Sequence, residues 1–237
     1  MKQPKRLFRG GVFLLIALAF TLPSLAHNVS ESNANFLADV TGPAIPLFIY
    51  LGAKHMVTGI DHILYLLGVV FFVYQPRQVL LFVSLFAIGH SITLVCGVWF
   101  AWQVNPAVVD AVIGLSVAYK AFENIAGFSI VFGRSPNVRL AIFAFGLVHG
   151  LGLATKLQAV YSGGDGLLVN LISFNVGVEL GQLLALGFLV AVLALWRRLA
   201  SFESSAFGAN LILMVCGFAL AMTHLLSLTL ASSGVGA

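Results

Sequence analysis

Histidine and carboxylate side chains recur inside long apolar stretches of this sequence. The first stretch contains His55, Asp61 and His62, and later stretches contain His90 and His149. An ionisable group at membrane depth is costly, so its presence there points to a function. Imidazole nitrogens and carboxylate oxygens are typical ligands of nickel, cobalt, zinc and iron(II), whereas calcium sites are rich in oxygen. These residue types therefore predict a site for a divalent transition-metal ion.

Several of these groups lie at a similar depth. Counted from the ends of their stretches, His90, His149, Glu179 and His224 are all near the membrane midplane. A single intramembrane histidine is usually explained by an interhelical hydrogen bond, but several histidines beside carboxylates favour a metal. Residues four and seven apart share one helix face, so Glu179 lies on a polar stripe with two amides. The predicted metal ligands are His62, Asp61, His90, His149 and Glu179, with His55 and His27 at the outer face, and the supporting residues are Asn175, Gln182, Ser91 and Thr93.

The spacing of His55 and His62 leaves two arrangements open. They are seven positions apart, which is roughly 10 Å along an unbroken helix, whereas metal–nitrogen bonds are about 2 Å long. The two imidazoles can therefore share an ion only if Gly59 breaks the helix and brings His55 back. Otherwise the two histidines serve successive sites along a path.

The composition indicates that these residues lie in a membrane. Of 237 residues, 60% are hydrophobic and only 8% are charged, against roughly 25% charged in a soluble domain. A soluble globule of this length could not cover its surface with so few charges, which excludes soluble enzymes. The net charge of +4 does not indicate a nucleic-acid partner, because removing residues 1–26 lowers Lys+Arg from 12 to 8 and leaves all 8 acids.

The N-terminus has the features of a cleavable signal peptide over residues 1–26. Basic residues precede an apolar core at 12–22, and small residues stand before the expected cleavage point. An uncleaved anchor helix is the alternative, although the core is short for a span. Cleavage makes His27 the mature N-terminus, whose α-amine and imidazole together can chelate a metal. Residues 27–42 would then form a short extracytoplasmic lead.

Six apolar stretches follow within residues 43–232 and predict an all-α polytopic membrane protein. Each is long enough to cross a hydrocarbon core of roughly 30 Å at about 1.5 Å per residue. The first is overlong and contains Gly52 and Gly59, which predicts a broken or re-entrant segment. Cys96 and Cys216 lie inside apolar runs and are interpreted as buried small hydrophobes. The stretches run over about 43–74, 78–102, 106–128, 138–160, 167–196 and 206–232.

The distribution of basic residues predicts the orientation. With the mature N-terminus outside, the outer connections near 102–105 and 161–166 contain no lysine or arginine. The cytoplasmic connections contain five arginines, as the positive-inside rule requires. We therefore expect six spans in the plasma (inner) membrane, with the mature N- and C-termini extracytoplasmic. The five residues are Arg77, Arg134, Arg139, Arg197 and Arg198.

Four ordered sequence blocks resemble a known family. The string H-M-V-T-G-I-D-H at 55–62 is similar to the signature H-P-x-x-G-x-D-H of the HupE/UreJ proteins, small polytopic membrane proteins associated with nickel supply to hydrogenase and urease. Met56 occupies the position of the signature's proline, and Gly152 occupies the position where the nickel-permease branch has a glutamate. The resemblance therefore leaves the identity of the ion open between nickel, cobalt and other divalent metals. The other blocks are G-H-S-I-T-L at 89–94, F-G-L-V-H-G-L-G-L-A at 145–154 and F-N-V-G-V-E-L-G-Q at 174–182.

The metal-ligand pattern and the resemblance together predict transport of a divalent metal ion, nickel or cobalt first, with zinc or iron possible. The sequence has no ATP-binding signature, so ion gradients or the membrane potential would drive the ion. An inward-moving +2 ion gains about 4.6 kcal/mol through a potential of about 100 mV. The expected partners are the metal ion, the lipid bilayer and a metalloenzyme maturation system, because a metal-supply accessory role is the first alternative.

Two further alternatives are an intramembrane metal-dependent enzyme and a haem-binding electron carrier. The sequence lacks H-E-x-x-H, the G-x-S-G loop and the clustered histidines of di-iron hydroxylases, so we expect no enzymatic activity. Two histidines on different helices could ligate haem. Asp61 and Glu179 would, however, be costly beside a porphyrin.

Overall fold

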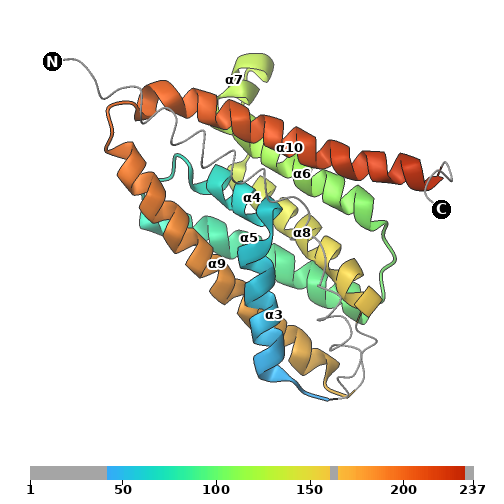
Figure 1. Ribbon diagram of the computed structural model, residues 1–237. Helices are drawn as coiled ribbons and strands as arrows, with labels where there is room; N and C mark the ends of the chain where they lie inside the picture. The colour runs from blue at the N-terminus through green and yellow to red at the C-terminus, as the bar shows by residue number, and fades with distance from the viewer. Residues whose placement is uncertain (1–41, 161–164, 233–237) are drawn as a thin grey trace.

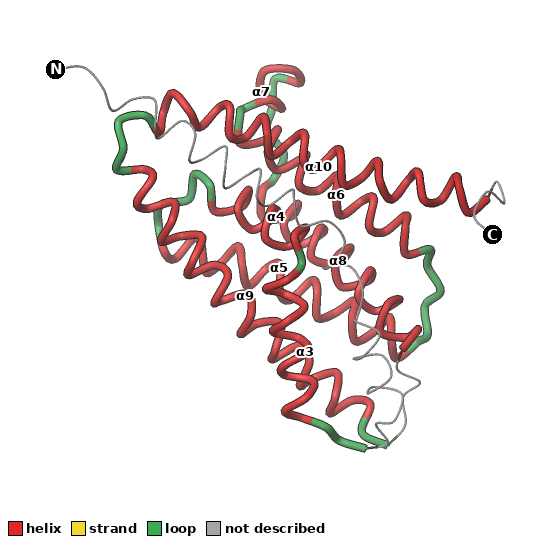
Figure 2. The backbone as a smooth tube through the Cα atoms, viewed as in Figure 1, coloured by secondary structure: helices red, strands yellow, loops and turns green. Residues whose placement is uncertain are grey.

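The computed structural model describes residues 42–160 and 165–232, and this part of the chain consists of helices joined by loops (Figures 1 and 2). The predicted signal peptide and His27 lie outside the described residues. Within the described ranges the helices are α3 (Ile45–Thr58), α4 (Ile60–Val70), α5 (Pro76–Trp99), α6 (Pro106–Asn124), α7 (Gly127–Phe132), α8 (Val138–Val160), α9 (Leu167–Arg197) and α10 (Phe202–Ser232).

The first apolar segment is broken at Gly59, as its sequence predicts. Helix α3 ends at Thr58 and α4 begins at Ile60, with Gly59 in an extended conformation between them (φ −71°, ψ 105°). The chain changes direction at this point (Figure 1). The Gly59 N–H still donates to the His55 carbonyl at 2.9 Å, so the end of α3 stays attached to the start of α4.

Three helix pairs form the body of the protein, namely α3 with α9, α5 with α8 and α6 with α10. Glycines bring the backbones of each pair into contact. A Cβ atom at Gly177, Gly150 or Gly217 would lie only 2.0, 2.0 and 2.4 Å from a backbone atom of the partner helix. Helices in a bilayer associate through close packing of small residues, because lipid tails are as apolar as the side chains.

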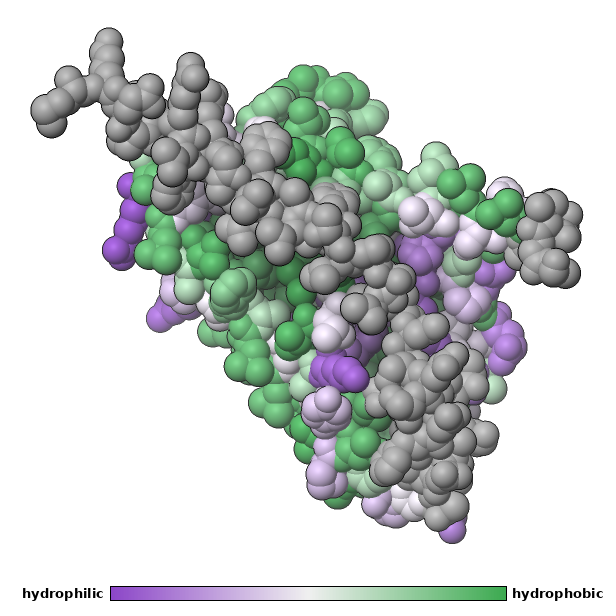
Figure 3. Space-filling view, viewed as in Figure 1, coloured by the Kyte–Doolittle hydropathy of each residue, from purple (hydrophilic) through white to green (hydrophobic). Residues whose placement is uncertain are grey.

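Four helices, α5, α8, α9 and α10, are long and apolar enough to cross a membrane. The other two predicted spans are interrupted by polar features. Helix α6 has 19 residues but contains Asp110, Lys120 and Glu123, while the first segment is divided into helices of 14 and 11 residues. Hydrophobic side chains cover much of the described surface in Figure 3. The fold is therefore all-helical and consistent with a polytopic membrane protein.

Contacts at the helix ends fix the relative directions of the segments. The Arg197 guanidinium donates to the carbonyls of Val70 and Phe71 at 2.7 and 2.6 Å, so the ends of α9 and α4 meet. At the opposite end, the Asn170 side chain accepts a hydrogen bond from the Ala44 N–H at 2.8 Å, so the starts of α9 and α3 meet. The first and fifth segments thus run in the same direction.

Candidate metal centre

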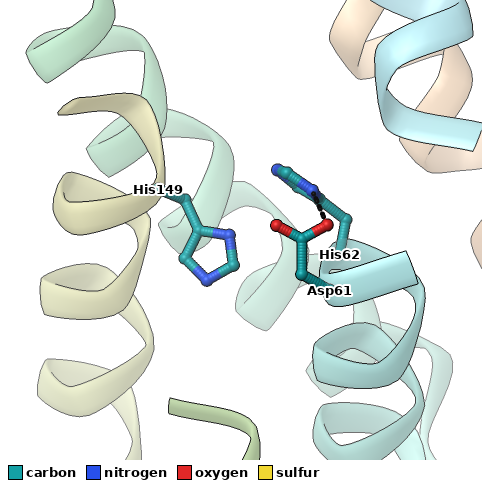
Figure 4. Close-up of side chains that lie close together, drawn as sticks. All are labelled: Asp61, His62 and His149. Carbon is teal, nitrogen blue, oxygen red and sulfur yellow. Dashed lines mark hydrogen bonds and ion pairs between the residues drawn. The ribbon is translucent and has the colours of Figure 1, made fainter. Parts of the chain in front are cut away.

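Three potential metal ligands meet beside the break at Gly59. Asp61 and His62 come from the first turn of α4, and His149 comes from α8. Each offers a ligand atom, and these atoms lie within 4.8 Å of one another. The three side chains face a common point in Figure 4. His62 and His149 are buried, with 3% and 1% of their surfaces exposed.

Two further histidines flank this group, with His62 at the centre. The centroid of the His62 ring is 4.9 Å from that of His149, 4.9 Å from that of His55 and 6.3 Å from that of His90. The His55 and His62 rings are therefore much closer than the roughly 10 Å expected along an unbroken helix. The break at Gly59 brings the His55 ring beside that of His62, which itself belongs to the group of potential ligands.

The separation of the ligand atoms is compatible with metal binding after small side-chain movements. Bonds of about 2.1 Å place two ligands of one ion at most roughly 4.2 Å apart. The ligand atoms here lie within 4.8 Å of one another, so metal binding requires them to approach by less than about 1 Å. Side-chain rotations can supply a movement of this size. The donor set of imidazole nitrogen and carboxylate oxygen suits nickel, cobalt, zinc or iron(II).

Most imidazole nitrogens in this cluster have no hydrogen-bond partner. Buried polar atoms are nearly always paired, because an unpaired one costs about 1–3 kcal/mol. Five unpaired nitrogens on four neighbouring rings, two of which belong to the group of potential ligands, indicate a ligand. Among the described residues they are His55 Nε2, His62 Nε2, His90 Nδ1, His90 Nε2 and His149 Nδ1.

The two nitrogens that are paired define which lone pairs face the centre. The Ser116 hydroxyl donates to the Ile113 carbonyl at 2.7 Å, so its contact with His149 Nε2 at 3.3 Å makes Ser116 the acceptor. The contact of His62 Nδ1 with Asp61 Oδ1 at 3.1 Å likewise makes that nitrogen the donor. In its neutral form His149 therefore keeps its lone pair on Nδ1, and neutral His62 keeps its lone pair on Nε2. Both atoms are among the unpaired nitrogens of the cluster. Such partners orient metal-binding histidines.

Gly59 leaves room for the Asp61–His62 pair, which yields a testable prediction. A Cβ at Gly59 would lie 2.7 Å from His62 Nδ1 and 3.0 Å from Asp61 Oδ1. We expect Gly59→Ala to displace this pair and lower metal affinity about 10- to 100-fold. The fold should persist, since φ of −71° is accessible to alanine. Titration calorimetry in detergent measures the affinity, and unchanged affinity would show that the pair is not part of the centre.

The supporting residues beside His90 connect α5 to two neighbouring helices. The Ser91 hydroxyl donates to Asn175 Oδ1 on α9 at 3.0 Å, and the Thr93 hydroxyl donates to a carbonyl of α8 at 2.6 Å. Gln182 is 1% exposed, and its Nε2 has no partner within the described part of the chain. Ser91, Thr93 and Asn175 therefore hold α5 in place, and with it His90.

Glu179 does not join the cluster, although the sequence places it there. Its side chain is exposed on α9, whereas the residues Gly177 and Gln182 are buried. Gly177 and Gly181 of α9 contact the backbone of α3, and Glu179, two positions from each, lies about 200° around the helix from both. His224 also lies elsewhere, with Nδ1 3.8 Å from Asp110 Oδ2.

The structure adds residues to the centre that the sequence pattern did not indicate. Ser116 orients His149 from α6, and the rings of Tyr65 and Phe86 lie 5.4 and 5.0 Å from that imidazole. Hydroxyl and aromatic side chains are common in apolar helices, so neither type signals a site in the sequence. Only the packing of α4, α5 and α6 around α8 identifies them.

Comparison with known proteins adds one finding. The model of the family described as HupE / UreJ protein matches residues 31–233. This match includes the metal centre and all of the helices described above. No curated protein and no solved structure matches the chain.

Proposed function

The chain belongs to the HupE/UreJ family, and from this premise we propose that it transports a divalent metal ion, nickel or cobalt, across the plasma membrane without ATP hydrolysis. The family is associated with nickel or cobalt uptake, or with metal supply to metalloenzymes. One observation carries the proposal for this chain. Asp61, His62 and His149 place ligand atoms within 4.8 Å of one another beside the break at Gly59, and five nitrogens of this and the neighbouring imidazoles have no hydrogen-bond partner among the described residues.

The proposed path follows the broken first segment. With the arginine-bearing connections in the cytoplasm, α3 leads from the outer face to the histidines and α4 leads onward to the inner face. His27, at the start of the mature chain, and then His55 would capture the ion. The ion would pass to Asp61, His62 and His149. Broken helices are a common way to place ligands at the membrane midplane.

The direct test is metal uptake into proteoliposomes. We expect vesicles that contain the protein to accumulate radioactive nickel or cobalt when the interior is negative, because the potential favours entry of a +2 ion by about 4.6 kcal/mol per 100 mV. Empty vesicles are the control. Folded protein that binds neither ion would contradict the proposal. Folded protein that binds metal in detergent but accumulates none would instead favour the accessory role in metal supply.

Uptake should also depend on pH. Protons compete with metal for imidazole nitrogens, which protonate near pH 6.5 in water. We expect initial uptake to be severalfold lower at about pH 5.5 than at about pH 7.5, at one clamped membrane potential. The clamp separates ligand protonation from a change in driving force. Equal rates at both values would argue against ligation by histidine.

A further inference from the structure

A second polar site lies beside the metal centre, between α4, α6 and α8. It surrounds a cavity of about 10 Å³, which is room for roughly one water molecule. Four polar side chains line the cavity, namely Tyr65, Tyr119, Lys120 and Glu123, and the rest of its wall is apolar and belongs to α8. A site of this size with several polar groups suits a water or another small polar ligand.

Tyr65 connects this cavity to the histidines. Its ring centroid lies 5.4 Å from that of His149, and only 1% of the residue is exposed. Its hydroxyl has no hydrogen-bond partner within the described ranges, and Tyr65 lines the same cavity as Tyr119 and Glu123. A buried hydroxyl without a partner beside a cavity indicates a ligand there. Tyr65 also lies one helical turn after His62 in α4. This direction leads toward the arginine-bearing end of the helices, where Arg197 contacts the end of α4.

The partner of the Glu123 carboxylate, the Lys120 ammonium, has a second hydrogen-bond acceptor. The Lys120 ammonium forms an ion pair with Glu123 and also donates to Asn124 Oδ1 at 3.0 Å. The Asn124 amide is itself fixed by the Gly68 carbonyl at 2.8 Å and Asn210 Oδ1 at 2.9 Å. Lys120 therefore keeps a fixed acceptor when Glu123 turns toward another cation. Breaking a buried pair is otherwise strongly unfavourable.

We propose that Tyr65 and Glu123 form a second binding site for the transported cation, on the arginine-bearing side of the histidine centre. The site offers only oxygen donors, which hold a late transition-metal ion less tightly than imidazoles do. It therefore suits release of the ion after the histidines, and return of the Lys120 ammonium to Glu123 displaces the cation. This inference rests on the proposed transport function.

The decisive variant is Glu123→Gln, which removes the charge and keeps the size. We expect initial uptake to fall about 10-fold or more, while metal affinity in detergent, set by the histidines, stays within about twofold. Glu123→Asp keeps the charge and should restore much of the uptake. Glu203→Gln is the matched control, since Glu203 is an exposed carboxylate at the same end of the protein, and it should transport normally.

Two other variants test the roles of the neighbours. Tyr65→Phe removes one oxygen and leaves the Lys120–Glu123 pair intact, so uptake should fall severalfold with unchanged affinity at the histidines. Lys120→Met removes the competing ammonium, so the cation should be held longer. Both the maximal rate and the KM of uptake should then decrease together.

The outcomes separate this inference from the proposed function. A folded wild type that takes up no metal contradicts transport itself. A transporting wild type with normal uptake in Glu123→Gln overturns the second site alone. A low rate in Glu123→Gln that Glu123→Asp does not improve also overturns it, because the charge is then not what matters. If Glu123→Gln does not fold, Tyr65→Phe decides, and normal uptake by that variant overturns the site.

Discussion

Replacing His62 with alanine is expected to abolish metal uptake and to lower metal affinity at least about 100-fold. The effect is large because His62 occupies the centre of the cluster. Its ring lies 4.9 Å from those of both His55 and His149, and its Nδ1 contacts Asp61 at 3.1 Å. Its ring lies beside those of three other histidines, His55, His90 and His149, so its loss removes the side chain that connects them.

The measurement is uptake of radioactive nickel and cobalt into proteoliposomes, with affinity measured by calorimetry on the same detergent-purified protein. His224→Ala is the matched control. It removes an imidazole of the same size from a membrane helix, but this imidazole lies near Asp110 and outside the cluster. Normal uptake by folded His62→Ala would remove the histidine cluster from the path. Equal loss in both variants would point to a general effect of removing a histidine.

Gly150→Ala is expected to destabilise the folded protein by roughly 1–3 kcal/mol or more. A Cβ at Gly150 would lie 2.0 Å from the His90 carbonyl oxygen and 2.4 Å from Thr93 Oγ1. The carbonyl belongs to a helical backbone and cannot rotate away, so α5 and α8 must separate. Because His149 is the preceding residue, separation also moves two histidines of the centre apart, and metal affinity should fall together with stability.

Thermal unfolding in detergent, with and without nickel, tests this prediction. Gly187→Ala and Gly208→Ala are matched controls, because a Cβ at either position meets nothing within 4 Å. Both controls lie inside helices, where alanine is favoured over glycine by up to about 1 kcal/mol, so their stability should be unchanged or slightly higher. If Gly150→Ala unfolds at the same temperature as these controls, the close approach of α5 and α8 is not required.

The two departures from the family pattern have different structural settings. Met56 is fully buried beside Gly181 of α9, so it fills the interface where the family signature has proline. A Cβ at Gly152 would lie 3.1 Å from Val109 Cγ1 and 3.7 Å from Asp110 Oδ1. A carboxylate therefore already lies close to the position where the nickel-permease branch has its glutamate, although it comes from α6.

The sequence determined the helical character of the apolar segments. Each of the six predicted stretches contains helix in the structure, and the first one is broken at Gly59, one of its two candidate glycines, while Gly52 lies inside α3. These features follow from local chemistry, because a helix satisfies its own backbone hydrogen bonds in lipid. The sequence also identified Asp61, His62 and His149 as potential ligands, since charged and imidazole groups stand out in apolar runs.

Only the tertiary structure decided which polar residues face one another. It excluded Glu179 from the cluster, added Ser116, and placed His55 beside His62. The physical reason is that lipid is as apolar as the protein interior, so a helix in a membrane is hydrophobic on all sides and its periodicity does not mark the buried face. The rotation of each helix is set instead by close backbone contacts at glycines such as Gly150 and Gly177, which form between segments far apart in the sequence.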